Sequence, residues 1–124
     1  MSPSPPIGTA ALVVEPEHLA PHIGSGDVPV LATPWLLALC ERATVDAVAG
    51  MLGATETSVG VRVELEHLAS SRPGAEVVAT ATVAGNDGRH LDFIVEAREG
   101  DLVVGRGTIR RARVNRARFI EGRS

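Results

Sequence analysis

The sequence predicts an α+β domain in which one long helix packs against a single antiparallel sheet. Two features carry this prediction. Residues 34–51 have the apolar spacing of a helix, whereas the chain from residue 56 onward alternates apolar and polar residues in segments divided by turn residues. A short apolar segment also precedes the helix. One strand, one helix and then a meander of strands is the order expected of a curved sheet of about five strands wrapped around a central helix.

Length and composition limit the classes of protein to consider. At 124 residues the chain is long enough for one domain with a buried core. We expect a flexible tail at residues 1–7, a single domain at 8–120 and a C-terminal tail at 121–124. The net charge of -3 argues against a nucleic-acid partner. The lone Cys40 excludes an internal disulfide, and the chain has neither a signal-peptide pattern nor an apolar run long enough to span a bilayer. We therefore expect a cytoplasmic protein with no membrane partner.

The first half of the chain predicts a strand, a loop and the helix. Residues 8–14 are short and apolar and predict the first strand, and residues 15–32 mix proline, glycine and histidine and predict a loop. Thr33 is a good N-cap for the helix. Pro34 fits the first helical position, where a missing N–H costs nothing. Glycines end the helical pattern near residue 51.

The second half of the chain predicts a sheet, with turns at residues 72–74, 85–88 and 100–101. In the first of its strands one face is expected to carry Val59, Val61, Val63, Leu65 and His67. Gly60 interrupts that strand, which predicts a bulge or a close approach of the backbone to a ligand. A long central helix wrapped by a curved antiparallel sheet of about five strands is the hotdog fold.

Three polar residues are candidates for chemistry. Glu41 shares a helical face with apolar residues, where an ionised carboxylate needs a partner or a task; alternatively it is a boundary glutamate that reaches solvent or an arginine. His67 continues the inward valine series, and its alternative is a core histidine bound to a backbone carbonyl. Thr33 is fully explained as a cap. A hydroxyl, a carboxylate and an imidazole that converge on one pocket are nevertheless the groups that split esters and thioesters.

The remaining titratable groups predict structural roles. We interpret Cys40 as a small core residue and not as a nucleophile. The other histidines, His18, His22 and His90, are expected at the surface. No histidine or cysteine spacing has the form of a metal site, so we expect no bound metal.

Several segments resemble the fluoroacetyl-CoA thioesterase group of hotdog proteins. Residues 30–45 and 58–74 are similar to the family's helix-start and long-strand segments, and residues 105–112 are similar to its last strand. Together with the 85–88 hairpin, the resemblance covers nearly all of residues 8–120. It implies coenzyme A as part of an acyl-CoA substrate, with no separate cofactor.

The resemblance also implies roles for particular residues. The family's catalytic triad falls on Thr33, Glu41 and His67. The Glu41 carboxylate would attack the thioester or activate a water, with Thr33 orienting it and His67 acting as general acid and base. Gly60 and Arg111 fall on substrate-binding positions, where the Gly60 N–H would help to stabilise the oxyanion.

Two departures from the family pattern shape the predicted function. The fluoroacetyl specialists carry phenylalanines in the loop before the helix, whereas this chain has glycine, serine and aspartate at residues 24–27. Pro34 stands where the family has a glycine. We therefore predict an acyl-CoA thioesterase for a short- or medium-chain acyl group that is not selective for fluoroacetyl-CoA. The alternative is a non-catalytic hotdog module that binds acyl-CoA or another apolar ligand.

The resemblance further implies a homodimer, because hotdog proteins usually join their sheets edge to edge with the substrate between subunits. An exposed edge strand that must be covered gives an independent reason for this prediction. Seven of the twelve basic residues, all of them arginines, lie between Arg106 and Arg123. They indicate either a solvated terminal strand and tail or a patch for the phosphates of coenzyme A.

Overall fold

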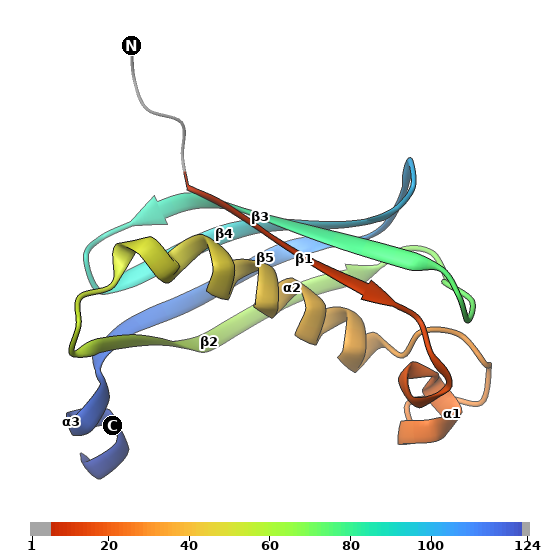
Figure 1. Cartoon of the computed structure of the whole chain (residues 1–124), viewed down its shortest axis with the longest axis horizontal. Coiled ribbons are helices and arrows are strands. Elements are labelled where there is room, and N and C mark those ends of the chain that lie inside the picture. The colour runs from red at the N-terminus through yellow and green to blue at the C-terminus, as the bar shows by residue number, and fades with distance from the viewer. Residues whose placement is uncertain (1–5, 123–124) are drawn as a thin grey trace.

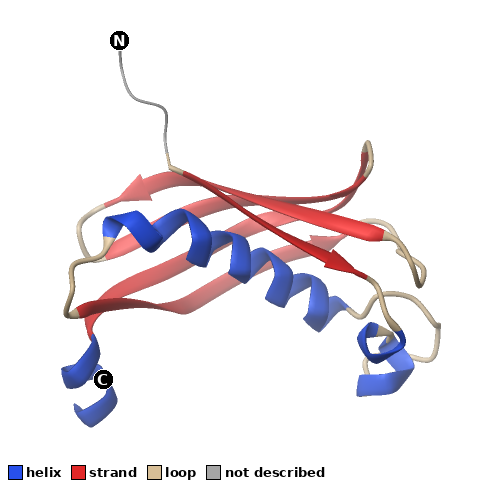
Figure 2. Cartoon of the chain, in the orientation of Figure 1, coloured by secondary structure: helices blue, strands red, loops and turns tan. Residues whose placement is uncertain are grey.

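The computed structural model describes residues 6–122 and contains one curved antiparallel sheet that wraps around a long helix (Figures 1 and 2). The strands are β1 Ile7–Val13, β2 Glu56–His67, β3 Glu76–Asn86, β4 His90–Glu99 and β5 Leu102–Asn115. Their order across the sheet is β1-β3-β4-β5-β2, so β1 and β2 form the two edges. The predicted α+β hotdog architecture is therefore confirmed.

The central helix α2 (Thr33–Val48) continues into a short 3-10 turn, η2 (Ala49–Met51), close to the predicted bounds. Its start differs from the prediction. Ala32 is the N-cap and no side chain caps the helix, so the expectation that Thr33 is the cap is wrong. The physical reason is that the Thr33 hydroxyl hydrogen-bonds elsewhere, to His67.

The core lies between α2 and the inner faces of β3 and β4. The alternation predicted for these strands is confirmed over residues 77–81 and 91–97, where every second residue is fully buried: Val77, Ala79 and Ala81 in β3, and Leu91, Phe93, Val95 and Ala97 in β4. The helix contributes mainly Leu36, Leu39, Cys40, Ala43 and Ala47. With Phe93 as its single buried aromatic side chain within residues 6–122, this core depends on close packing of small aliphatic groups.

The edge strand β1 is docked directly onto the helix. A side chain at Gly8 would place its Cβ 2.2 Å from the Ala43 carbonyl oxygen, so only glycine permits this approach. The neighbouring Thr9 N–H donates a hydrogen bond of 2.9 Å to the Asp46 carboxylate of α2. These contacts fix β1 across the helix, as Figure 1 shows.

The other edge strand, β2, contains an irregularity that the alternation did not predict. Its pairing with β5 shifts between Gly60 and Arg62, so Val61 is an extra residue, and its side chain is 52% exposed. The expectation that Val59 and Val61 continue the inward face of Val63 is therefore wrong. Gly60 lies on the helix side instead, and the bulge predicted from this glycine is confirmed.

The segments outside the sheet and helix differ in part from expectation. The loop before α2 contains a 3-10 turn, η1 (Pro16–His18), and a short helix, α1 (Ala20–Ile23). After β5 the chain forms α3 (Arg116–Gly122), which we did not predict and which takes in part of the expected tail at 121–124. Of the tail expected at 1–7, residues 1–5 lie outside the described residues, and Ile7 already belongs to β1. No helix within residues 6–122 has the length and hydropathy needed to cross a membrane.

Candidate active site

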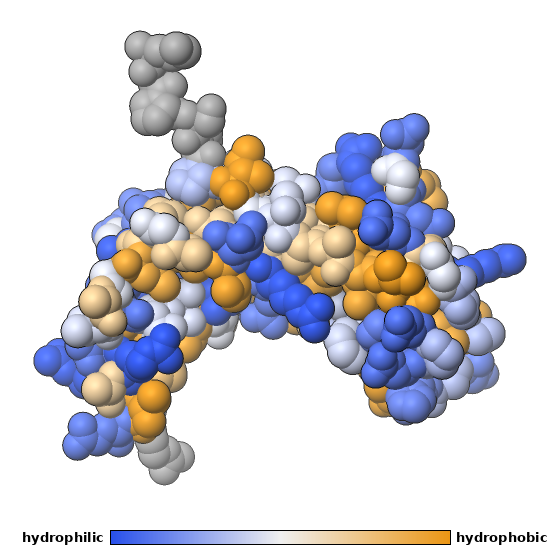
Figure 3. Space-filling view, viewed as in Figure 1, coloured by the Kyte–Doolittle hydropathy of each residue, from blue (hydrophilic) through white to orange (hydrophobic). Residues whose placement is uncertain are grey.

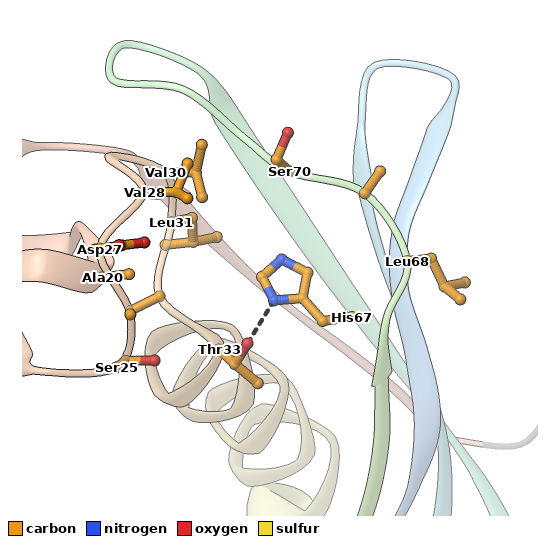
Figure 4. A pocket seen from close by; sticks show the side chains of 13 residues that line it. Ala20, Ser25, Asp27, Val28, Val30, Leu31, Thr33, His67, Leu68 and Ser70 are labelled. Atoms are coloured by element: carbon orange, nitrogen blue, oxygen red, sulfur yellow. Dashed lines mark hydrogen bonds between the residues drawn. The ribbon is translucent and has the colours of Figure 1, made fainter.

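Thr33 and His67 are joined by a hydrogen bond between the first residue of α2 and the last residue of β2. The Thr33 Oγ1 and His67 Nδ1 atoms lie 2.7 Å apart (Figure 4). The other ring nitrogen, Nε2, is buried and has no hydrogen-bond partner in the part of the chain that the structure describes. Burial lowers the pKa of His67, and the nearby backbone of Ala69 opposes this effect. The ring is therefore kept neutral, which a general base requires.

The pair lies in the wall of a pocket of about 450 Å³, between the loop before α2 and the segment after β2. In Figure 4 the His67 ring points toward Thr33 and Leu31, whereas Leu68 points away from it. Its lining includes the aliphatic residues Ala20, Val28, Val30, Leu31, Ala32, Leu68 and Ala69. Asp27 is the one acidic residue among the side chains that line it. The pocket has the size of a small-molecule site and presents a largely apolar wall next to a hydroxyl and an imidazole.

Glu41 lies two turns along α2 and points toward the bulge of β2. Its Oε2 is 3.6 Å from Nη1 of Arg111, and its side chain is 37% exposed. Gly60 is in close contact, because a Cβ at that position would lie 2.6 Å from the same carboxylate oxygen. Glu41 is thus a boundary glutamate that reaches an arginine, which was the alternative interpretation of the sequence. Val45, expected on the same inward face, is 49% exposed.

Arg111 is buried on the inner face of β5, although its neighbour Arg110 is exposed and paired with Asp92 on the outer face. The Arg111 guanidinium donates from Nε to Ser58 Oγ at 2.9 Å and from Nη2 to the Ser58 carbonyl at 3.1 Å. It also donates from Nη1 to Thr44 Oγ1 at 3.4 Å. Burial lowers the pKa of Arg111 and the Glu41 carboxylate opposes this, but an arginine remains charged in either case.

The five residues expected in the site therefore form two groups. Thr33 and His67 lie together at one end of the helix, and Glu41 lies with Gly60 and Arg111 near its middle. Eight residues separate Thr33 from Glu41, which corresponds to about 12 Å along a helix. Within a single chain the Glu41 carboxylate therefore belongs to a different part of the helix from the pair of Thr33 and His67.

Cys40 and His18 are titratable residues that lie in the packed interior and not in the pocket. Cys40 is fully buried, and desolvation raises the pKa of its thiol to about 11, so its interpretation as a core residue is confirmed. His18 was expected at the surface but is buried. Its ring contacts Trp35 edge-on at 4.5 Å, and its Nδ1 accepts a hydrogen bond from the Glu15 N–H. Within residues 6–122, no group of three or more histidine, cysteine, aspartate or glutamate residues could hold a metal ion.

Sequence reasoning assigned no role to Ser58 or Thr44, although both contact the Arg111 guanidinium. Neither residue carries a signal that could have been found from one sequence. A serine in a strand and a threonine in a helix are ordinary, and their contacts depend on Arg111, which lies far away along the chain.

Comparisons with known proteins agree with this fold. The chain matches the family described as FlK, fluoroacetyl-CoA-specific thioesterase, over residues 14–117. It is 36% identical over 90 residues to the fluoroacetyl-CoA thioesterase of Streptantibioticus cattleyicolor. That match spans 73% of this chain and 65% of the relative's length.

Solved structures give the same result. The structure of the fluoroacetyl-CoA thioesterase FlK matches with a TM-score of 0.88 and 29% identity over 98% of this chain and 95% of that one. A hypothetical protein of Thermus thermophilus, described as a thioesterase superfamily member, matches with a TM-score of 0.88 and 30% identity over 97% and 88% of the two chains. A mutant of FlK in complex with fluoroacetate and CoA matches with a TM-score of 0.85 and 31% identity over 95% and 99%.

The fold and these matches define a hotdog-fold protein of the thioesterase class. Because the family match covers most of the chain, the protein belongs to the fluoroacetyl-CoA-specific thioesterase family.

Proposed function

We propose that this protein is an acyl-CoA thioesterase that hydrolyses short- or medium-chain acyl thioesters and is not selective for fluoroacetyl-CoA. The observation that carries the proposal is the hydrogen bond between Thr33 and His67 in the wall of the 450 Å³ pocket. A neutral imidazole, oriented by a hydroxyl and facing an apolar space, is suited to move a proton beside an acyl group.

The pocket wall supports the proposed acyl range. Apart from Asp27, Thr33 and His67, its lining residues are small or aliphatic, and the lining includes no phenylalanine, tyrosine or tryptophan. Aliphatic walls gain free energy from each methylene that they remove from water, at about 0.8 kcal/mol per buried group. A pocket of this volume therefore favours an acyl chain of several carbons over a two-carbon one.

The reaction adds water across the C–S bond of the thioester and yields a carboxylic acid and the free thiol of coenzyme A. In one route the Glu41 carboxylate bonds to the carbonyl carbon and displaces the thiolate, and water then hydrolyses the resulting mixed anhydride. In the other route Glu41 takes a proton from the attacking water. In both routes neutral His67 takes up a proton that the water releases and passes it to the thiolate, so the ring ends neutral again. The backbone N–H at Gly60 stabilises the charge that develops on the carbonyl oxygen.

A homodimer completes the site, because the carboxylate and the imidazole of one chain belong to separate groups. The open edge of β2 allows a second copy to extend the sheet in the antiparallel sense. If the two-fold axis places Glu64 opposite its own copy and Val61 stays an extra residue, His67 of one copy faces Gly60 of the partner subunit. The glutamate beside that glycine then reaches the pocket next to His67.

The test is the release of free CoA from a panel of acyl-CoAs, from acetyl to octanoyl with fluoroacetyl-CoA included. Glu41→Gln and His67→Gln should each lower kcat about a hundredfold or more while the variants stay folded, the scale of a lost acid or base. The exposed residues Glu76 and His22 provide matched controls, since Glu76→Gln and His22→Gln make the same chemical changes away from the site.

Two outcomes would decide against the proposal. If the wild type released no CoA from any member of the panel but bound acyl-CoA in calorimetry, the protein would be a binding module. If fluoroacetyl-CoA were hydrolysed far more efficiently than butyryl-CoA, the proposed acyl range would be wrong. We also propose a cytoplasmic location, which the free and buried Cys40 supports.

A further inference from the structure

We propose that Ser58 and Thr44 are positioning residues, which fix Arg111 so that its guanidinium holds the Glu41 carboxylate beside Gly60. This inference rests on the proposed thioesterase function and concerns the same site. It assigns Arg111 a role that acts through Glu41 in place of a direct contact with the substrate.

The first step is the enclosure of the arginine. The Arg111 residue is 6% exposed, and its side chain is held between β2 and α2. Three of its nitrogen atoms already donate hydrogen bonds to Ser58 and Thr44. Coenzyme A phosphates are large, strongly hydrated groups, and a guanidinium that is buried and occupied in this way offers them no open face.

The second step is the direction of the hydrogen bonds. The Thr44 hydroxyl donates its single proton to the Glu41 backbone carbonyl at 2.6 Å. Its oxygen is therefore left to accept from Nη1 of Arg111. Ser58 accepts through both its hydroxyl and its carbonyl. Together they hold the planar guanidinium at two sides, so its orientation is set before any substrate enters.

The third step is what this orientation achieves. Within residues 6–122, Glu41 is the one acidic side chain in ion-pair contact with Arg111, at 3.6 Å. The distance is longer than a hydrogen bond, so the guanidinium acts on the carboxylate mainly as a fixed charge. A fixed cation on one side and the Gly60 backbone on the other restrict the positions of the carboxylate, which is the preorganisation that a nucleophile or base needs.

The experiment compares kcat and KM for butyryl-CoA in Ser58→Ala and Thr44→Val with the wild type. We expect kcat to fall about tenfold in each, the scale of one hydrogen bond to a charged group, with KM within about twofold. Ser58→Thr, which restores a hydroxyl, should recover most of the lost kcat. Arg110→Gln removes the neighbouring arginine from the outer face and should leave both constants unchanged.

The outcomes separate this inference from the proposed function. A variant in which KM rises while kcat is kept would make Arg111 a substrate ligand and overturn the inference. Unchanged kcat in both Ser58→Ala and Thr44→Val, with an active wild type, would overturn it and leave the thioesterase function standing. An inactive wild type would remove the function and the inference together. If the fully buried Thr44→Val failed to fold, Ser58→Ala would decide alone, since it leaves the carbonyl contact in place.

Discussion

Glu41 and Gly60 are in such close contact that a methyl group at residue 60 would lie 2.6 Å from the Glu41 Oε2 atom. Gly60 therefore has two functions in the structure. It forms the bulge in the edge strand, and it leaves the space that the carboxylate occupies.

The first prediction concerns this contact. Gly60→Ala should lower kcat roughly a hundredfold, because the carboxylate must move by about an ångström to clear the new methyl group. The melting temperature should change little, since the residue lies at an exposed edge. Gly50→Ala is the matched control, as a Cβ there meets no atom within 4 Å. Full activity in Gly60→Ala would show that the position of Glu41 does not matter.

The second prediction concerns subunit composition. Glu41→Ala and His67→Ala should each be inactive, but a co-refolded equal mixture should regain about a quarter of wild-type turnover. Half of the dimers are then mixed, and one of the two sites in each is intact. Each variant refolded alone is the control. Mass spectrometry of the mixture would establish that mixed dimers have formed. If they have formed and turnover does not recover, the glutamate and the histidine of a working site belong to the same chain.

The third prediction concerns the pH dependence of stability. Burial lowers the pKa of His67 from 6.5, so the unfolded chain binds a proton at a higher pH than the folded chain does. The free energy of unfolding therefore falls as the pH decreases through about 6.5, and His67 has no such effect at higher pH. In urea unfolding at about pH 7.5 and pH 5.5, the free energy of unfolding should fall less between the two pH values for His67→Gln than for the wild type. His22→Gln, at an exposed position on α1, controls for the removal of a histidine. If the free energy of unfolding fell by the same amount in the wild type and in His67→Gln, the prediction would be contradicted.

The fourth prediction concerns substrate charge. Asp27 is the one carboxylate in the pocket lining, so an acyl chain that ends in a carboxylate is repelled there. Asp27→Asn should raise kcat/KM for succinyl-CoA about fivefold relative to butyryl-CoA, and added salt should reduce the difference. Glu17→Gln removes an exposed carboxylate outside the lining and should not alter the ratio. A ratio unaffected by Asp27→Asn would mean that the acyl group lies elsewhere.

The sequence predicted best where local pattern and tertiary packing agree. Over residues 77–81 of β3 and 91–97 of β4 the alternation is uninterrupted, and a period of two is enough to decide which residues face the helix. In β2 the extra Val61 reverses the faces, and a fixed period cannot reveal an inserted residue, although Gly60 indicated the bulge. His18 was misassigned because its burial depends on Trp35, which lies on another element.

In the candidate site, too, residues with a local sequence signal were predicted and residues whose contacts depend on the fold were not. Thr33 has the local sequence pattern of an N-cap, but its hydroxyl hydrogen-bonds to His67 in a distant strand. The resemblance selected Thr33, Glu41 and His67 as a set, yet only the folded chain reveals that they form two separate groups. Ser58 and Thr44 carried no local signal, since their contacts exist only where β2, β5 and α2 meet around Arg111.

The extra residue in β2 also bears on aggregation. A long unpaired strand is a template onto which foreign strands can add, and β2 is a long strand at an open edge. The bulge shifts the register of β2 by one residue. A regular strand added to this edge can therefore pair correctly with the residues on one side of Val61 only. Beyond the bulge the edge carries the exposed charges of Arg62, Glu64 and Glu66, which disfavour an apolar partner. The same irregularity that makes room for Glu41 thus protects the open edge of the sheet from indiscriminate extension.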